Sequence, residues 1–216
     1  MNEKYLQPGR FIDSGHPRIV EFTHANAKGR QDRDRAIALY YAVRDAVRYH
    51  PFQNFTIDET YTASVCLERG SGWCVPKAAL LAACARVAGI AARVGYADVK
   101  NHLTTPELTE KMGGTDLFVY HGYTDLYLDG NWVKATPAFN LSLCKRFRVK
   151  PLEFDGVNDS IFHPYDEDNR RHMEYVRSRG TFADVPAEAI KQAFAELYPH
   201  AFLLGPDAAS MKFAPA

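Results

Sequence analysis

The sequence predicts an α+β protein, and three stretches of the chain support that prediction. The glycine-rich turn Gly70-Ser71-Gly72 leads into Cys74 and an alanine-rich helix that runs towards Gly89. Residues 91–99 are predicted as a strand. Residues 117–136 are predicted as two more strands joined by the hairpin dipeptide Asp129-Gly130. Helices and antiparallel strands therefore occupy separate stretches, which is typical of the α+β class.

Length and composition set limits on the kind of protein. A chain of 216 residues suits a single domain, which we predict to span residues 1–216. The 26 basic residues equal the 26 acidic ones, and this balance favours neither a nucleic-acid partner nor a membrane partner. The first ten residues lack an apolar leader and no long apolar run follows, so a cytoplasmic location is expected. The four cysteines show no paired C-x-x-C spacing and are expected to be thiols.

The elements before the cysteine helix are predicted from breakers and periodicity. Residues 1–30 contain several glycines and prolines and are expected to be irregular, with a short strand at residues 19–22. A helix capped by Asp32 or Asp34 follows, and its apolar face runs to the stop at His50-Pro51. Residues 51–70 are mixed, with an extended segment or a short helix near residues 62–65.

The elements after the cysteine helix are predicted in the same way. Residues 100–115 are expected to be a loop with a helical turn near residues 107–111, crossing the cleft and able to gate it. Residues 141–180 are rich in charge and breakers and are expected to be loops that wall one side of the cleft and set selectivity. A last helix is predicted from about Pro186 to Leu197, so residues 141–216 form a loop-rich extension with a C-terminal helix.

Cys74 is the candidate nucleophile because of its position at a helix start. The free N–H groups and the partial positive charge there favour a thiolate. The competing interpretation is a small buried hydrophobe, which suits Cys84 inside the apolar helix. Cys66 and Cys144 lack the glycine-rich, helix-opening context.

A thiol nucleophile needs a base that removes its proton and returns it to the leaving group, and histidine suits that role near neutral pH. Of the eight histidines, His121 lies in the strongest predicted strand. A strand packed beside the cysteine helix would direct its imidazole at the helix N-terminus. The alternative is a structural histidine held by hydrogen bonds.

The order of these features resembles the transglutaminase-like superfamily of cysteine hydrolases and acyltransferases. The matching residues fall within about residues 60–140 and are Gly72-x-Cys74, Ala78, Leu81, Gly89-Ile90-Ala91-Ala92-Arg93, His121, Asp125-Leu126-Tyr127-Leu128 and Asn131-Trp132-Val133. The resemblance implies a papain-like core in which the cysteine helix packs on an antiparallel sheet. It also implies a catalytic triad that includes Cys74 and His121.

The third member of that triad departs from the family pattern. The family usually places an aspartate four residues after the tryptophan, and here that position is Thr136. A hydroxyl accepts a hydrogen bond from imidazole but lacks the charge of a carboxylate, a difference of roughly 1 kcal/mol or more. Asn140 would give a Cys-His-Asn arrangement, and Asp125 and Asp155 are further acids. Asp125 lies on the strand of His121 but ~13 Å along it.

The resemblance implies an enzyme that attacks an amide or another acyl carbonyl of a peptide or small molecule through a Cys74 thioester, as a peptidase, an amidase or an acyltransferase. The departure at Thr136 supports an alternative, a catalytically inactive binding module on the same fold. Backbone N–H groups at the helix start, that of Cys74 first, would form the oxyanion hole. Trp73 is expected either to line the cleft or to pack beside it. Tyr96, Tyr120, Tyr123 and Phe139 are further candidates for the cleft, and half or more of them are expected in the core.

No cofactor is expected, because the sequence contains neither a Gly-x-Gly-x-x-Gly nor a Walker-type loop. His163, Asp166, Asp168 and His172 are possible metal ligands, but no metal site is predicted there because their spacing matches no helical zinc motif. The sequence leaves the oligomeric state open.

Overall fold

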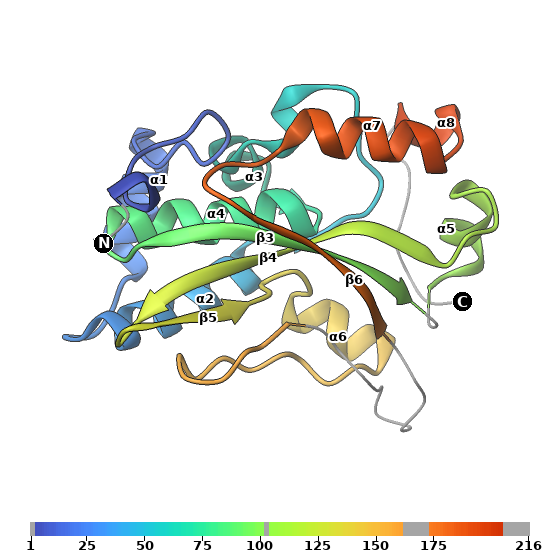
Figure 1. Ribbon diagram of the computed structural model, residues 1–216. Helices are drawn as coiled ribbons and strands as arrows, with labels where there is room; N and C mark the ends of the chain where they lie inside the picture. Colours follow the sequence, from blue (N-terminus) through green and yellow to red (C-terminus); the bar gives the residue numbers. More distant parts are fainter. Residues whose placement is uncertain (1–2, 102–103, 162–172, 205–216) are drawn as a thin grey trace.

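A computed structural model describes residues 3–101, 104–161 and 173–204. Its centre is a four-stranded antiparallel sheet in the order β5-β4-β3-β6. The strands are β3 (Ala92–Asn101), β4 (Leu117–Leu128), β5 (Asn131–Ala135) and β6 (Met173–Phe182). The helix α4 (Cys74–Val87) runs behind β3 and β4 (Figure 1).

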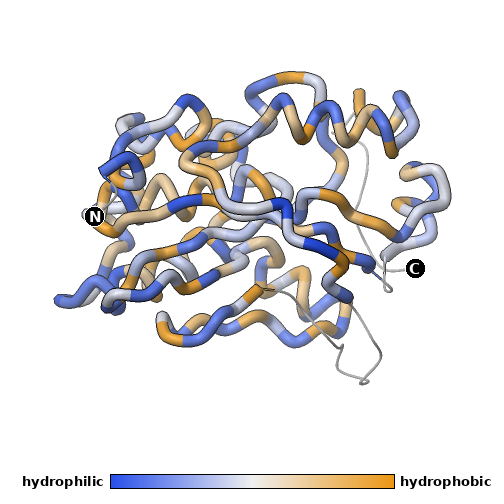
Figure 2. The backbone as a smooth tube through the Cα atoms, in the orientation of Figure 1, coloured by the Kyte–Doolittle hydropathy of each residue, from blue (hydrophilic) through white to orange (hydrophobic). Residues whose placement is uncertain are grey.

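The alanine content of α4 explains its central position. Thirteen of its residues are buried, from Cys74 through Arg86, so the helix is surrounded on all sides. Its neighbours are the sheet and the helices α1 (Pro17–Asn26), α2 (Asp32–Ala46) and α3 (Ala63–Arg69). Small side chains permit this close approach of several elements to one helix. Figure 2 shows hydrophobic residues along α4 and a mostly hydrophilic β6.

The hairpin between β4 and β5 turns at the predicted dipeptide. Asp129 has φ 48° and Gly130 has φ 88°, the positive values that a tight two-residue hairpin turn requires. Leu128 pairs with Asn131 and Thr124 with Ala135, so the register keeps Leu126 and Leu128 buried. The prediction of this hairpin is confirmed.

Short elements complete the chain. The two-stranded parallel sheet consists of β1 (Arg48–Tyr49) and β2 (Ser71–Gly72). The remaining helices are η1 (Glu3–Tyr5), η2 (Asp58–Tyr61), α5 (Pro106–Lys111), α6 (Leu141–Phe147), α7 (Ala187–Leu197) and α8 (His200–Leu203). Every helix in the described part of the chain is too short or too polar to cross a bilayer.

Three sequence-based predictions of structure are wrong. The helix expected to run to His50-Pro51 ends at Ala46, and β1 follows it. Residues 19–22, expected as a strand, lie within α1, where Pro17 occupies the first turn and Ile19 and Thr23, one turn apart, are buried. Residues 141–180, expected as loops, contain α6 and β6. Because β6 is an edge strand with most of its side chains exposed, its sequence lacks the apolar alternation by which strands are recognised.

Candidate active site

Cys74 occupies the first position of α4, as predicted. Gly70 ends α3 in the left-handed conformation, with φ 60°, and turns the chain towards β2. Gly72 then passes close to α3, where a Cβ atom would stand 2.6 Å from Cys66 Sγ. The spacing Gly72-x-Cys74 is therefore a packing requirement that brings Cys74 to the start of the helix.

The strand β4 crosses α4 at this first turn, and Gly122 makes the crossing possible. A Cβ atom on Gly122 would lie 3.2 Å from Val75 Cα and 3.3 Å from Cys74 O, which is tight contact with the helix backbone. Two residues later, Thr124 Oγ1 donates a hydrogen bond to Ala78 O at 2.8 Å. Gly122 thus fixes its neighbour, His121, beside the start of α4.

A β-bulge lies immediately before His121. Ala97 pairs with His121 and Val99 with Phe118, so Asp98 on β3 faces the two residues Val119 and Tyr120 on β4. Tyr120 has φ 55°, an unusual value for a residue with a side chain. The bulge fixes the path of β4 at the point where it presents His121.

The carboxylate of Asp98 holds the bulge in place. Asp98 is buried and accepts a hydrogen bond from Tyr120 N at 3.1 Å. Arg177 and Arg179 reach it from β6 at 2.8 and 2.9 Å, and the Arg179 guanidinium lies 4.6 Å from the centre of the Tyr120 ring. These contacts hold the pKa of Asp98 below its usual value even though burial alone would raise it.

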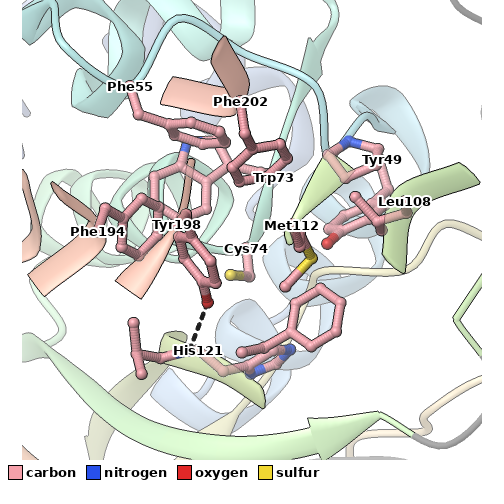
Figure 3. A pocket seen from close by; sticks show the side chains of 13 residues that line it. Tyr49, Phe55, Trp73, Cys74, Leu108, Met112, His121, Phe194, Tyr198 and Phe202 are labelled. Atoms are coloured by element: carbon pink, nitrogen blue, oxygen red, sulfur yellow. Dashed lines mark hydrogen bonds between the residues drawn. The ribbon is translucent and has the colours of Figure 1, made fainter. Parts of the chain in front are cut away.

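Cys74 and His121 line the same cavity (Figure 3). Its walls come from residues far apart in the sequence. Tyr49, Pro51 and Phe55 precede α3, and Leu108 and Met112 belong to α5 and its C-cap. Phe194 and Phe202 belong to α7 and α8, and Tyr198 lies between these two helices. Trp73, Phe118 and Val119 complete the lining.

Trp73 both lines the cavity and packs beside it. Its ring lies 4.9 Å from that of Phe55, and its Nε1 donates to Thr60 O at 3.2 Å. Of the other aromatic candidates, half or more were expected in the core, and Tyr96 and Tyr120 belong to it. Tyr96, Tyr120, Tyr123 and Phe139 are absent from the lining of this cavity, as are the described residues between 141 and 180. The predicted position of residues 100–115 near the cleft is confirmed by Leu108 and Met112, which line the cavity, whereas their role as a gate stays a prediction.

The resting protonation state of Cys74 differs from the sequence-based expectation. Burial raises the pKa of the Cys74 thiol to about 11, although hydrogen bonds from the backbone of Gly122, Val75 and Cys74 itself lower it. The helix terminus acts on the sulfur as expected, but the loss of solvation outweighs it. The site therefore holds a thiol at neutral pH, and a base has to remove its proton.

The four candidates for the third position all have other partners. Thr136 Oγ1 donates to Ile161 O at 2.6 Å, and Asn140 accepts from Tyr49 N at 2.9 Å and donates to Ser142. Asp125 pairs with Arg93 at 2.8 Å, and Asp155 caps its own turn through Val157 N and Asn158 N. Because the Thr136 hydroxyl donates its one proton to Ile161 O, it can take part in a further hydrogen bond only as an acceptor.

The metal site considered at His163, Asp166, Asp168 and His172 lies outside the described residues. Within the ranges that the structure describes, no group of three or more histidine, cysteine or acidic side chains is arranged to hold a metal ion.

Comparison with protein families identifies the chain. The model of the transglutaminase-like superfamily matches residues 21–137, more than half of the sequence. The chain belongs to the transglutaminase-like superfamily. The matched region begins well before residue 60, where the resemblance was expected to start, and includes α2 and most of α1. The predicted fold class, with the cysteine helix against an antiparallel sheet, is confirmed.

Solved structures with a similar backbone are distant in sequence. A proposed cysteine protease from Cytophaga hutchinsonii is 15% identical, with a TM-score of 0.45 over 82% of this chain and 53% of that one. A proposed protease from Parabacteroides distasonis is 16% identical, with a TM-score of 0.40 over 62% of this chain and 25% of that one. The chain thus spans about half or less of each of these proteins. Among curated proteins, none matches it.

Proposed function

We propose that this protein is a thiol enzyme that acts on an amide or another acyl carbonyl of a peptide or small molecule. The observation that carries the proposal is that Cys74, at the start of α4, and His121, on β4, line one cavity. Membership of the transglutaminase-like superfamily supports the same chemistry. Cys74 is the nucleophile, and His121 is the base.

The reaction begins with a neutral thiol because burial disfavours the thiolate. His121 takes the proton from Sγ as the sulfur attacks the acyl carbon, and the carbonyl oxygen becomes an oxyanion. The backbone N–H of Cys74 at the helix start stabilises that oxyanion. His121 then gives the proton to the departing amine as the carbon–nitrogen bond breaks, which leaves a thioester on Cys74.

The second half of the reaction releases the acyl group. Water or an amine attacks the thioester, and His121 removes a proton from this attacking group. The carbon–sulfur bond then breaks, and His121 returns the proton to Sγ, which restores the Cys74 thiol. Water makes the protein a peptidase or an amidase, and an amine makes it an acyltransferase.

Thr136 is proposed as the residue that orients His121. It follows β5, whose last residue, Ala135, pairs with Thr124 on the strand of His121. Because the hydroxyl proton of Thr136 goes to Ile161 O, its lone pairs can accept a hydrogen bond from an imidazole N–H. Of the alternatives, Asn140 and Asp155 have the partners given above, and Asp125 pairs through Oδ2 with Arg93.

The test uses p-nitrophenyl acetate, an activated acyl donor, with the full-length chain. We expect a mass increase of one acetyl group that maps to Cys74, followed by turnover. His121→Ala slows acylation about 100-fold or more, because the base is lost. The matched control, Cys144→Ala, removes a buried thiol outside the cavity and leaves the rate unchanged. Turnover that persists in Cys74→Ala would refute the proposal.

The second candidate is a catalytically inactive binding module on the same fold. Two observations favour it: a threonine at position 136 and a thiol whose pKa is raised to about 11. In a protein of this kind, Cys74 is acylated no faster than a thiol in solution. The same mass measurement therefore separates the two candidates.

A further inference from the structure

The cavity around Cys74 is built almost entirely from apolar groups. Leu108, Met112 and Phe118 form one part of its wall, and Phe55, Phe194 and Phe202 form another. Among the described residues that line it, there is no aspartate, glutamate, lysine or arginine. Figure 3 shows Leu108, Met112, Phe55, Phe194 and Phe202 on the walls around the Cys74 sulfur.

Two polar side chains in the lining already have partners in the backbone. Trp73 Nε1 donates to Thr60 O at 3.2 Å. The Tyr198 hydroxyl donates to Leu117 O at 2.9 Å and accepts from Val119 N at 3.0 Å. These bonds hold the walls in place and occupy two of the polar groups that could otherwise solvate a charged substrate; Tyr49 and His121 are the other polar side chains of the lining.

A charged group in such a cavity would lose its water without gaining a partner of opposite charge. An aliphatic group there would instead remove apolar surface from water on both sides. The cavity has a volume of about 40 Å³, which is room for about three water molecules. The space therefore suits a group of a few carbon atoms.

We propose that the substrate carries a short, uncharged aliphatic group beside the reacting acyl carbon, and that Leu108, Met112 and Phe118 select for it. This inference rests on the proposed function, because it names the acyl groups that Cys74 accepts. Met112 and Phe118 are specificity-determining residues, which contact the acyl chain and take no part in the chemistry.

The test compares two esters of nearly identical size. p-Nitrophenyl butyrate and p-nitrophenyl β-alaninate differ by one terminal group, a methyl in the first and an ammonium in the second. In each reaction the bond between Sγ and the acyl carbon forms, the carbon–oxygen bond to p-nitrophenol breaks, and His121 passes the thiol proton to the leaving oxygen. Each rate is divided by the rate with 2-mercaptoethanol to remove the difference in intrinsic reactivity.

We expect butyrate to acylate Cys74 roughly 100-fold faster than β-alaninate after this correction. Met112→Glu places a carboxylate in the wall and should reduce the preference at least tenfold, whereas Met112→Gln, which has the same shape without the charge, should reduce it less. Met112 is only 1% exposed, so Met112→Glu can fail to fold. Phe118 is half-buried and accommodates a carboxylate more easily, so Phe118→Glu provides a second test of the same wall.

The outcomes separate this inference from the proposed function. Acylation of Cys74 by both esters at equal corrected rates, or an unchanged preference in folded Met112→Glu and Phe118→Glu, overturns the inference and leaves the thiol enzyme in place. Acylation of Cys74 by neither ester overturns the proposed function, and this inference with it.

Discussion

Gly122 lies directly against the backbone of Cys74, because a Cβ atom at position 122 would stand 3.3 Å from Cys74 O. This close approach brings two distant parts of the sequence into one site. A side chain at position 122 would push β4 away from α4, and His121 would move with it.

Gly122→Ala should therefore lower both stability and acylation of Cys74. The added methyl group overfills the contact with Val75 and Cys74, and we expect a loss of about 1–3 kcal/mol in the free energy of unfolding, measured by urea denaturation. The control is Gly15→Ala, where the new Cβ would meet Pro8 Cγ at an ordinary 3.8 Å. Equal stability in the two variants would contradict the tight crossing.

Asp98→Asn should weaken the bulge that presents His121. The amide keeps an oxygen for Tyr120 N but loses its charged bonds to Arg177 and Arg179, which we expect to lower the free energy of unfolding by about 1–3 kcal/mol. Acylation of Cys74 should slow about tenfold or more, since small displacements of a base have large effects on rate.

The control for Asp98 is Arg177→Gln. The Arg177 side chain is 61% exposed, so the expected loss of stability is below about 1 kcal/mol. NMR titration of the His121 imidazole gives a readout besides stability. If Asp98→Asn unfolds more easily but leaves both the His121 titration and the acylation rate unchanged, Asp98 has no role in positioning.

Tyr198→Phe removes a hydroxyl that serves two backbone groups of β4. The buried Val119 N and the partly buried Leu117 O would lose their partner, and we expect a loss of about 1–3 kcal/mol in the free energy of unfolding. Tyr175→Phe, on the exposed side of β6, should change stability by less than about 0.5 kcal/mol. Thermal denaturation of the two variants tests the difference, and comparable melting temperatures would refute it.

The buried side chain of Lys77 should make the stability of the protein depend on pH. It lies one turn after Cys74, is fully buried, and donates from Nζ to Arg44 O at 2.9 Å and to Val47 O. Burial lowers the pKa of Lys77 to about 7, from 10.5. Above pH 7 the folded state has released a proton that the unfolded state still holds, so the contribution of Lys77 to stability rises with pH.

The comparison with Lys77→Met isolates this effect. Between pH 7 and 9 the free energy of unfolding of the wild type, relative to that of the variant, should increase by up to about 1.4 kcal/mol per pH unit. Urea denaturation at several pH values measures it. A difference that stays constant or falls over this range would show that the lysine keeps its proton in the folded state.

Local sequence determined much of the framework. The glycine-rich turn predicted the start of α4 at Cys74, and Asp129-Gly130 predicted the hairpin, because these residues act through backbone preferences that depend little on distant contacts. The same local reasoning failed at residues 19–22. There a short apolar patch suggested a strand, but burial of Ile19 and Thr23 against the rest of the protein favours a helix.

The candidate site also has features that local sequence predicts and features that depend on tertiary packing. The sequence by itself pointed to Cys74 and His121, because a thiol at a helix start and a histidine in a strand are recognisable without knowledge of their neighbours. Only the tertiary structure decided which side chains surround them, since Leu108, Met112, Phe194 and Phe202 reach the cavity from elements far away in the chain. The helix terminus that favours a thiolate can be predicted from the local sequence. The tertiary structure decided that Cys74 rests as a thiol, because the solvation of its sulfur depends on all the residues packed around it.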